Sequence, residues 1–184
     1  MFPMARRTTK TRTTRRRRQQ WGRGSSSSGV TDAELAAMQK KYGKRGILDP
    51  LAEELNPLTG EPYENPERYR ADTWWTKLPV FSRIGAILDS LEENQVTLVR
   101  SGTGSGKTVL VPKIVSHYFG YEGRVITTIP KRLITLKAAE RDARLMDVRL
   151  GKEVGYFYGG GARMSGTRTK LVFTTPGSLI SVMR

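Results

Sequence analysis

The segment Ser101-Gly-Thr-Gly-Ser-Gly-Lys107-Thr108 contains residue types that can hold a phosphate group. Its three glycines allow positive φ and let backbone N–H groups approach phosphate oxygens closely. A lysine here can place its ammonium group between the β- and γ-phosphates of a nucleotide, and the following hydroxyl can hold Mg²⁺. The segment therefore predicts a site for a nucleotide and Mg²⁺ formed by Gly102, Thr103, Gly104, Ser105, Gly106, Lys107 and Thr108, with Lys107 and Thr108 acting on the reacting phosphate.

The residues on either side of this segment favour a phosphate-binding P-loop. An apolar run at 95–100 precedes the segment and a second one at 109–115 follows it, which predicts strand, turn and helix in that order. Ser101 departs from the usual Gly or Ala at the first position, but it is also small. The alternative is a Gly/Ser-rich surface loop that happens to contain Lys-Thr, and the flanking pattern disfavours it.

The remaining elements predict a fold that can position such a loop. Apolar and β-branched runs predict further strands at 124–129, 153–158 and 170–175, the last two separated by a loop at 159–169. Alternation with helices predicts an α/β domain with a mostly parallel, doubly wound sheet, whose ligand site lies at the carboxyl ends of the strands. We expect Ser82 to cap the helix before the loop. The helix at 131–146 is predicted to bury Leu133, Leu136, Ala139 and Ala143.

Basic residues are concentrated at the N-terminus. Nine of the 32 Lys and Arg residues lie in residues 1–24, which contain no acidic residue. The remaining residues contain the other 23 basic residues and all 17 acidic residues, so they contribute a net charge of +6 to the total of +15. Residues 1–29 are thus predicted to be a disordered Arg-rich tail with a Ser linker. Such tails bind nucleic-acid phosphates or act as localisation signals.

Several classes of protein and compartment are disfavoured by the sequence. No cysteine is present, so disulfides and thiol metal sites are excluded. No run of 18 apolar residues occurs, and the N-terminus lacks the apolar core of a secretory signal, so we expect neither a membrane span nor secretion. We expect an intracellular protein, with the nucleus and a virion or viral replication site as destinations. An organellar transit peptide is the second interpretation.

Residues 30–73 are predicted to form a connecting region before a compact domain at 74–184. Thr31 and Glu34 form a capping box for a short helix that ends at Gly43. Prolines at 50, 57, 62 and 66 then favour an extended wrap. His117, the single histidine, has no partner at metal-ligand spacing, and we predict that it lies on a helix surface.

From Trp75 onward the sequence resembles the first RecA-like domain of superfamily 2 helicases, most closely the DEAH/RHA (DExH) branch. Several blocks occur in the family's order. Thr103–Thr108 resembles motif I, Thr128-Ile-Pro-Lys-Arg132 resembles motif Ia, and Ala139-Glu-Arg141 follows in register. Residues 146–156 continue that register, and Thr175-Pro-Gly177 resembles motif Ib. This order of blocks is more specific than a P-loop alone.

The resemblance implies ATP and Mg²⁺ as cofactors and a single strand of RNA or DNA as partner. It implies that motifs Ia and Ib grip the sugar–phosphate backbone through Pro130, Lys131, Arg132, Thr175 and Gly177, and that Arg141 packs on the nucleotide base. Simpler alternatives remain open. Lys131 and Arg132 could be solvated charges, although cations at a helix start oppose the helix dipole. Arg141 could be a surface arginine, and 175–177 an ordinary turn with an N-cap at Ser178.

The family's Asp-Glu-x-His motif and second RecA domain are expected beyond Arg184. We therefore expect these 184 residues to be the N-terminal part of an ATP-dependent helicase or translocase that is inactive by itself. The alternative is a non-enzymatic, basic nucleic-acid-binding or virion-packaged protein on the same scaffold. A P-loop kinase or GTPase is disfavoured, because the register of 128–156 fits neither and no guanine-specifying motif occurs.

Overall fold

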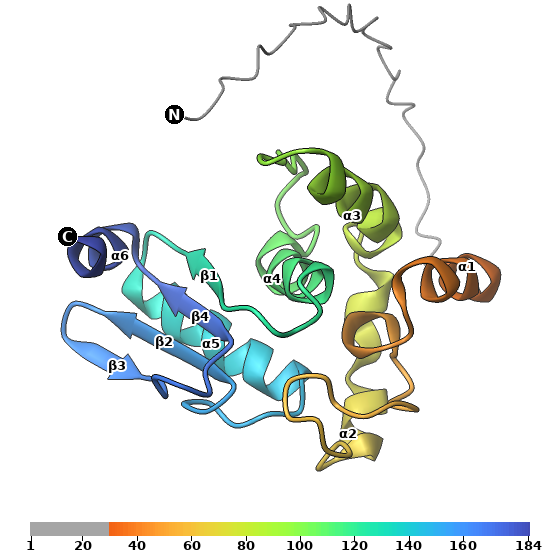
Figure 1. Cartoon of the computed structure of the whole chain (residues 1–184), viewed down its shortest axis with the longest axis horizontal. Coiled ribbons are helices and arrows are strands. Elements are labelled where there is room, and N and C mark those ends of the chain that lie inside the picture. The colour runs from red at the N-terminus through yellow and green to blue at the C-terminus, as the bar shows by residue number, and fades with distance from the viewer. Residues whose placement is uncertain (1–29) are drawn as a thin grey trace, which may run out of the picture.

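The computed structural model describes residues 30–184, so the predicted tail and Ser linker at 1–29 lie outside the described residues (Figure 1). The elements, in chain order, are α1 Asp32–Tyr42, η1 Gly46–Leu48, α2 Pro66–Ala71, η2 Thr73–Lys77, η3 Phe81–Arg83, α3 Ile84–Glu93, α4 Lys107–Tyr118, β1 Val125–Thr128, α5 Arg132–Leu145, β2 Val154–Tyr158, β3 Gly161–Arg163, β4 Leu171–Thr174 and α6 Pro176–Met183. Across residues 30–184, no helix has the length and apolar character needed to cross a bilayer.

The sheet confirms the predicted mostly parallel α/β fold. Its order is β1-β4-β2-β3, with β4 parallel to both β1 and β2, and β3 antiparallel to β2. Helix α5 packs along β2 and β4, while α4 lies beside β1 (Figure 1). Strand β3 was not predicted, because the Gly-rich residues 159–161 read as a loop. Gly159 and Gly160 form the turn of a short hairpin instead, and Gly161 begins β3.

The strand predicted at 95–100 is absent from this sheet. Residues 95–100 have no assigned secondary structure, and Val96 and Leu98 are 85% and 90% exposed. Thr97 and Val99 line a cavity of ≈ 430 Å³ between this segment and β1. A strand needs a hydrogen-bonded neighbour. No described segment pairs with residues 95–100, so the apolar alternation there does not produce one.

Helix α5 buries Ala139 and Ala143 as predicted, leaves Leu136 half-buried and exposes Leu133. Leu133 is 65% exposed, whereas the buried residues include Thr135, Ala138, Ala139 and Asp142. These positions recur at spacings of three and four residues, as one face of a helix requires. The prediction was wrong at Leu133 because it weighted hydrophobicity. The structure instead places small residues against the sheet and pairs the buried carboxylate with a lysine.

Residues 30–80 pack closely against the rest of the molecule. Ile47, Leu48, Tyr63 and Tyr69 join one hydrophobic core with residues of α3 and α4, and Leu58 joins the core under the sheet. The side chain of Asn56 donates to the carbonyl of Met146 at 2.8 Å. The segment expected to be an extended wrap therefore supplies core side chains and includes the short elements η1 and α2.

The predicted helix cap is present at α1 and absent at α3. The capping box between Thr31 and Glu34 is present, and Gly43 ends α1 as predicted. Helix α3 begins after Arg83 without a side-chain cap. Ser82, the predicted cap, lies in η3, and its hydroxyl donates to the carbonyl of Pro79. That short 3₁₀ turn directly before α3 displaces the helix start from Ser82.

Candidate nucleotide and nucleic-acid site

The P-loop leads directly into helix α4. Gly106 is its N-cap with φ +94°, and Gly104 has φ +78°, so both lie in the region that favours glycine. Gly102 has no positive φ, so two of the three glycines in the loop use this conformational freedom. A Cβ on Gly106 would also lie 2.6 Å from Leu78 Cδ1. Conformation and space together require glycine at 106.

The loop is fixed to the segment that precedes α3. The Val80 N–H donates to the carbonyl of Ser105 at 3.1 Å, and Leu78 packs on Gly106. Ser105 is buried, whereas Ser101 to Gly104 and Thr108 are exposed. One side of the loop is thus held against the protein while the other faces solvent, where a ligand can reach it.

Lys107 folds back over the loop. Its Nζ donates to the carbonyls of Ser101 at 2.7 Å and Gly102 at 2.8 Å. The hydroxyls of Ser101 and Ser105 lie 3.1 and 3.3 Å from the same nitrogen. The ammonium is therefore centred in the concave side of the loop, at the start of α4.

These residues fit a phosphate and its metal ion. The first amides of a helix have no intrahelical acceptor and carry the positive end of the helix dipole, which favours an anion beside Lys107. The exposed hydroxyl of Thr108 can serve as one oxygen ligand of Mg²⁺. The residues lining the cavity between this loop and β1 include no Asp or Glu. The loop therefore provides phosphate contacts and only one metal ligand.

The segments that resemble motifs Ia and Ib follow two neighbouring strands. Thr128 pairs with Thr174 in the parallel ladder of β1 and β4, and the Ile129 N–H donates to the Thr174 carbonyl at 2.8 Å. Residues 130–132 and 175–177 therefore leave the sheet side by side. Lys131 and Arg132 are exposed at the start of α5, and Pro176 and Gly177 are exposed at the start of α6.

Ser178, considered above only as an N-cap, and Gly159, which the sequence did not single out, connect these segments to the β2–β3 turn. The Ser178 hydroxyl lies 2.9 Å from the Thr175 hydroxyl and accepts from the Gly159 N–H at 3.0 Å. A Cβ on Gly159 would lie 3.3 Å from Nη2 of Arg132, so the guanidinium borders that turn. Thr175, rather than Ser178, is the N-cap residue of α6. The three consecutive glycines at 159–161 were the available sequence signal.

Comparisons with known proteins show what this arrangement is similar to. A putative ATP-dependent RNA helicase of Acanthamoeba polyphaga mimivirus is 44% identical over 138 residues, which cover 74% of this chain and 20% of that protein. The ATP-dependent RNA helicase HrpA of Borreliella burgdorferi is 32% identical over 109 residues, covering 59% of this chain and 13% of that protein. No protein-family model matches.

A solved structure agrees with these relatives. The E. coli DExH-box NTPase HrpB matches with a TM-score of 0.53 and 29% identity, over 58% of this chain and 13% of that one. This chain is related to the DExH-box helicases of superfamily 2. Its mostly parallel α/β fold is that of a RecA-like helicase domain. It spans 20% or less of the length of the two curated relatives named above.

In this DExH-like chain, Arg141 lies on the exposed face of α5. The next residue, Asp142, is buried and lies 3.7 Å from Nζ of Lys113 on α4. Burial raises the pKa of Asp142 to about 7, and burial likewise lowers the pKa of Lys113. The packing of Arg141 on a nucleotide base stays a prediction.

His117 is buried, contrary to its predicted surface position. It is 4% exposed, and its Nε2 lies 2.9 Å from the carbonyl of Tyr42. Burial lowers its pKa, and Nδ1 has no hydrogen-bond partner among the described residues. The neutral ring with a proton on Nε2 satisfies this carbonyl. His117 therefore links α4 to the end of α1.

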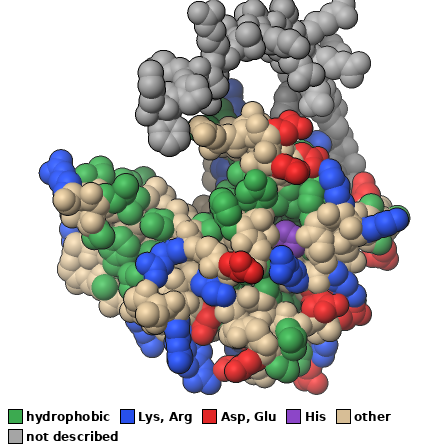
Figure 2. Space-filling view, viewed as in Figure 1, with side chains coloured by type: hydrophobic (Ala, Val, Ile, Leu, Met, Phe, Trp, Pro, Cys, Tyr) green, Lys and Arg blue, Asp and Glu red, His purple; other side chains and the backbone are tan. Residues whose placement is uncertain are grey.

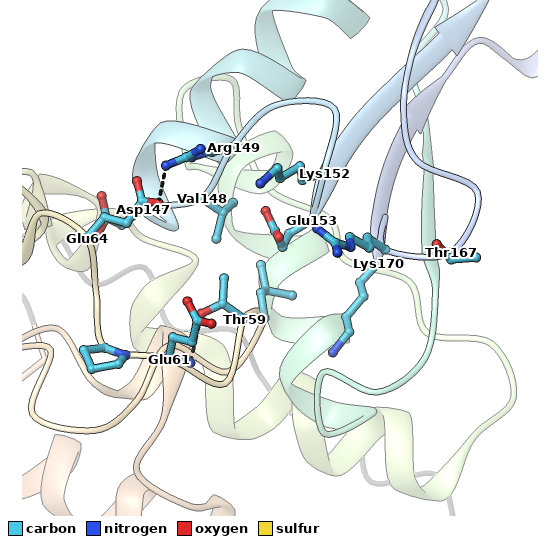
Figure 3. Close-up of a pocket in the computed structure, with 13 residues that line it drawn as sticks. Thr59, Glu61, Glu64, Asp147, Val148, Arg149, Lys152, Glu153, Thr167 and Lys170 are labelled. Atoms are coloured by element: carbon cyan, nitrogen blue, oxygen red, sulfur yellow. Dashed lines mark hydrogen bonds and ion pairs between the residues drawn. The ribbon is translucent and has the colours of Figure 1, made fainter.

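A second cavity of the DExH-like domain lies away from the P-loop. It has a volume of ≈ 450 Å³ and is bordered by residues 58–64, the turn after α5 and the residues that precede β2 and β4 (Figure 3). Acidic Glu61, Glu64 and Glu153 face basic Arg149 and Lys152, and Arg149 pairs with Glu64 at 2.9 Å. The cavity adjoins the amino ends of the parallel strands, opposite the motifs. Its mixed charge does not favour a phosphate.

Proposed function

We propose that this chain is the nucleotide-binding part of an ATP-dependent nucleic-acid helicase or translocase, acting on RNA. The observation that carries this proposal is the parallel pairing of β1 with β4, which brings motifs Ia and Ib together at the carboxyl edge of the sheet. The P-loop helix α4 packs beside β1 of the same sheet. The names of the relatives, which are RNA helicases, support RNA as the substrate.

In the proposed mechanism, Lys107 and the first amides of α4 neutralise charge on the β- and γ-phosphates of ATP. Mg²⁺, held through Thr108, would supply further neutralisation of the phosphates. Arg141 would stack its planar guanidinium on the base. The residues that line the cavity between the loop and β1 include no carboxylate to orient an attacking water. We therefore expect this chain by itself to bind ATP weakly and not to hydrolyse it above background.

For the nucleic acid, the proposal assigns the sugar–phosphate backbone of one strand to Pro130, Lys131, Arg132, Thr175 and Gly177. The exposed cations at 131 and 132 lie where the dipole of α5 also favours an anion. Surface charge elsewhere is mixed, and apolar side chains gather over α6, where Ile180, Val182 and Met183 are exposed (Figure 2). Contacts to phosphate alone are sequence-independent and salt-sensitive.

Calorimetry with Mg·ATP tests the nucleotide site. Lys107→Ala should remove most of the binding, because it deletes the ammonium group that lies over the loop and is proposed to contact the phosphates. Lys137→Ala, which removes an exposed lysine of α5, is the matched control. Equal affinities of the wild type and Lys107→Ala would refute the P-loop assignment. ATP turnover that survives purification and is lost in Thr108→Ala would contradict the expected inactivity.

Deletion of residues 1–24 tests the tail and the alternative function together. The nine cations should dominate affinity, so deletion should weaken binding to duplex and single strand and flatten the salt dependence. The remaining chain should prefer single strands. Equal binding of both forms by the deleted chain would instead favour the non-enzymatic, tail-driven alternative. A full chain without salt dependence would make the tail a localisation signal.

A further inference from the structure

Ser101 makes contacts within the P-loop that glycine or alanine at the same position would not make. Its hydroxyl lies 2.6 Å from the hydroxyl of Ser105 and 3.1 Å from Nζ of Lys107. The Ser105 hydroxyl in turn lies 3.3 Å from the same Nζ. Two hydroxyls and one ammonium group therefore form a closed triangle, which we call the serine clamp (Ser101, Ser105 and Lys107).

The clamp uses up the donors of Lys107. An ammonium group has three N–H donors and no acceptor. Two of its four oxygen neighbours are the backbone carbonyls of Ser101 and Gly102, which would be present whatever side chains stood at these positions. The other two are the hydroxyls of the clamp. For Lys107 to bind a phosphate, some of these contacts must be released.

The clamp is anchored on one side only. Ser105 is 6% exposed, and its carbonyl accepts from the Val80 N–H. Ser101, by contrast, is exposed at the start of the loop and follows the unpaired segment 95–100. The position of Ser105 is therefore set by the fold. Ser101 is the member whose hydroxyl can be removed without disturbing the core.

We propose that Ser101 is a positioning residue that lowers the affinity of the loop for nucleotide phosphates by holding Lys107 and Ser105 in the serine clamp. This inference rests on the proposed function of the P-loop. Lys107 is assigned to both the β- and γ-phosphates, so the clamp competes with the binding of ATP and ADP alike. In the strict P-loop motif, glycine or alanine stands at this position and has no hydroxyl that could compete with the nucleotide for Lys107.

Calorimetry on the full chain with Mg·ATP and with Mg·ADP tests the proposal. Ser101→Ala should bind each nucleotide about three- to tenfold more tightly, the range expected for the loss of one competing hydrogen-bonding group. Ser101→Thr keeps the hydroxyl and should return the affinity to the wild-type value. Ser165→Ala, in the loop before β4, controls for serine loss elsewhere. Unchanged or weaker binding of both nucleotides by Ser101→Ala overturns the proposal.

A double-mutant cycle adds a test of the contact itself. Because Ser101 and Ser105 share one hydrogen bond, their alanine variants should change the affinity less than additively when combined. Fully additive effects overturn the clamp. Weaker ATP binding with unchanged ADP binding in Ser101→Ala also overturns it, since that result assigns the hydroxyl to the γ-phosphate.

An NMR measurement separates this inference from the proposed function. The ammonium signal of Lys107, assigned with Lys107→Arg, should exchange with water faster in Ser101→Ala than in the wild type and in Ser101→Thr. An equal exchange rate in all three overturns the clamp. Nucleotide affinities that are the same for the wild type and Lys107→Ala overturn the P-loop function, and the exchange measurement then still decides whether the clamp exists.

Discussion

Lys113 of α4 and Asp142 of α5 face each other in the interior, with Nζ 3.7 Å from Oδ1. That distance makes an ion pair but is long for a hydrogen bond. Both side chains are almost fully buried, at 4% and 1% exposure, and Nζ and Oδ2 have no hydrogen-bond partner among the described residues. The ring of Trp75 lies 5.8 Å from Nζ. Helices α4 and α5 are thus joined by a buried pair of charges.

Removal of one member of this pair should destabilise the protein strongly. Lys113→Met leaves an unpaired buried carboxylate, and we expect a loss of about 3–5 kcal/mol in the free energy of unfolding. The double variant Lys113→Met with Asp142→Leu should recover most of that loss, because apolar groups replace both charges. Urea unfolding followed by tryptophan fluorescence measures both. A double variant no more stable than the single one would contradict the ion pair.

The exposed pair Lys137–Glu140 on α5 provides a control for this experiment. Its atoms are 2.8 Å apart, but both side chains are largely exposed. Solvent screens such pairs, so Lys137→Met should change the stability by less than about 1 kcal/mol. The contrast between two lysine-to-methionine changes tests burial rather than charge.

His117 should make stability depend on pH on the acidic side of neutrality. Its pKa in the folded protein lies below the usual value of 6.5, so the folded state binds fewer protons than the unfolded state. Its contribution is fully present above 6.5 and is lost as the pH falls through the lowered value, with a slope of up to about 1.4 kcal/mol per unit. His117→Gln, which keeps a donor for the Tyr42 carbonyl, should remove this component.

Urea unfolding of wild type and His117→Gln between pH 5 and 8 measures the difference. Asp142 acts with the opposite sign, because its pKa is raised to about 7 and its contribution is lost as the pH rises. Both chains contain Asp142, so their difference isolates His117. A difference that is constant across the range would show that His117 does not titrate in this way.

Gly106→Ala should destabilise the protein through both backbone and packing. A residue with a Cβ at φ +94° costs about 1–2 kcal/mol, and the Cβ would collide with Leu78 at 2.6 Å. We expect a total loss of about 2 kcal/mol or more. Gly102→Ala has ordinary φ and no neighbour within 4 Å, so its thermal unfolding should match that of the wild type. Equal melting temperatures of both variants would refute the loop geometry.

Lys131→Ala and Arg132→Ala should each reduce the salt dependence of binding to single-stranded RNA. The slope of log K against log salt should fall by about 0.7 for each lost phosphate contact. Lys137→Ala, five residues further along α5 from Arg132, should leave the slope unchanged. Filter binding at several salt concentrations measures it. Equal slopes for all four chains would place the strand elsewhere.

Local patterns in the sequence determined the P-loop and most elements of the sheet. Residues 101–108 are contiguous, so their residue types and spacing identify the motif without knowledge of the fold. Strands β1, β2 and β4 were predictable because short β-branched and aromatic runs lie between helices. The resemblance to superfamily 2 helicases, now supported by the relatives, rested on the order of such local blocks.

The tertiary structure alone decided which distant residues meet. The pairing of Thr128 with Thr174, which brings the segments resembling motifs Ia and Ib together, depends on β4 entering the sheet between β1 and β2. The burial of His117 and of the Lys113–Asp142 pair depends on helix packing that no local period encodes. Residues 95–100 show that a local pattern alone does not make a strand. Apolar alternation specifies a face for burial, but only a hydrogen-bonded neighbour can make the segment a strand.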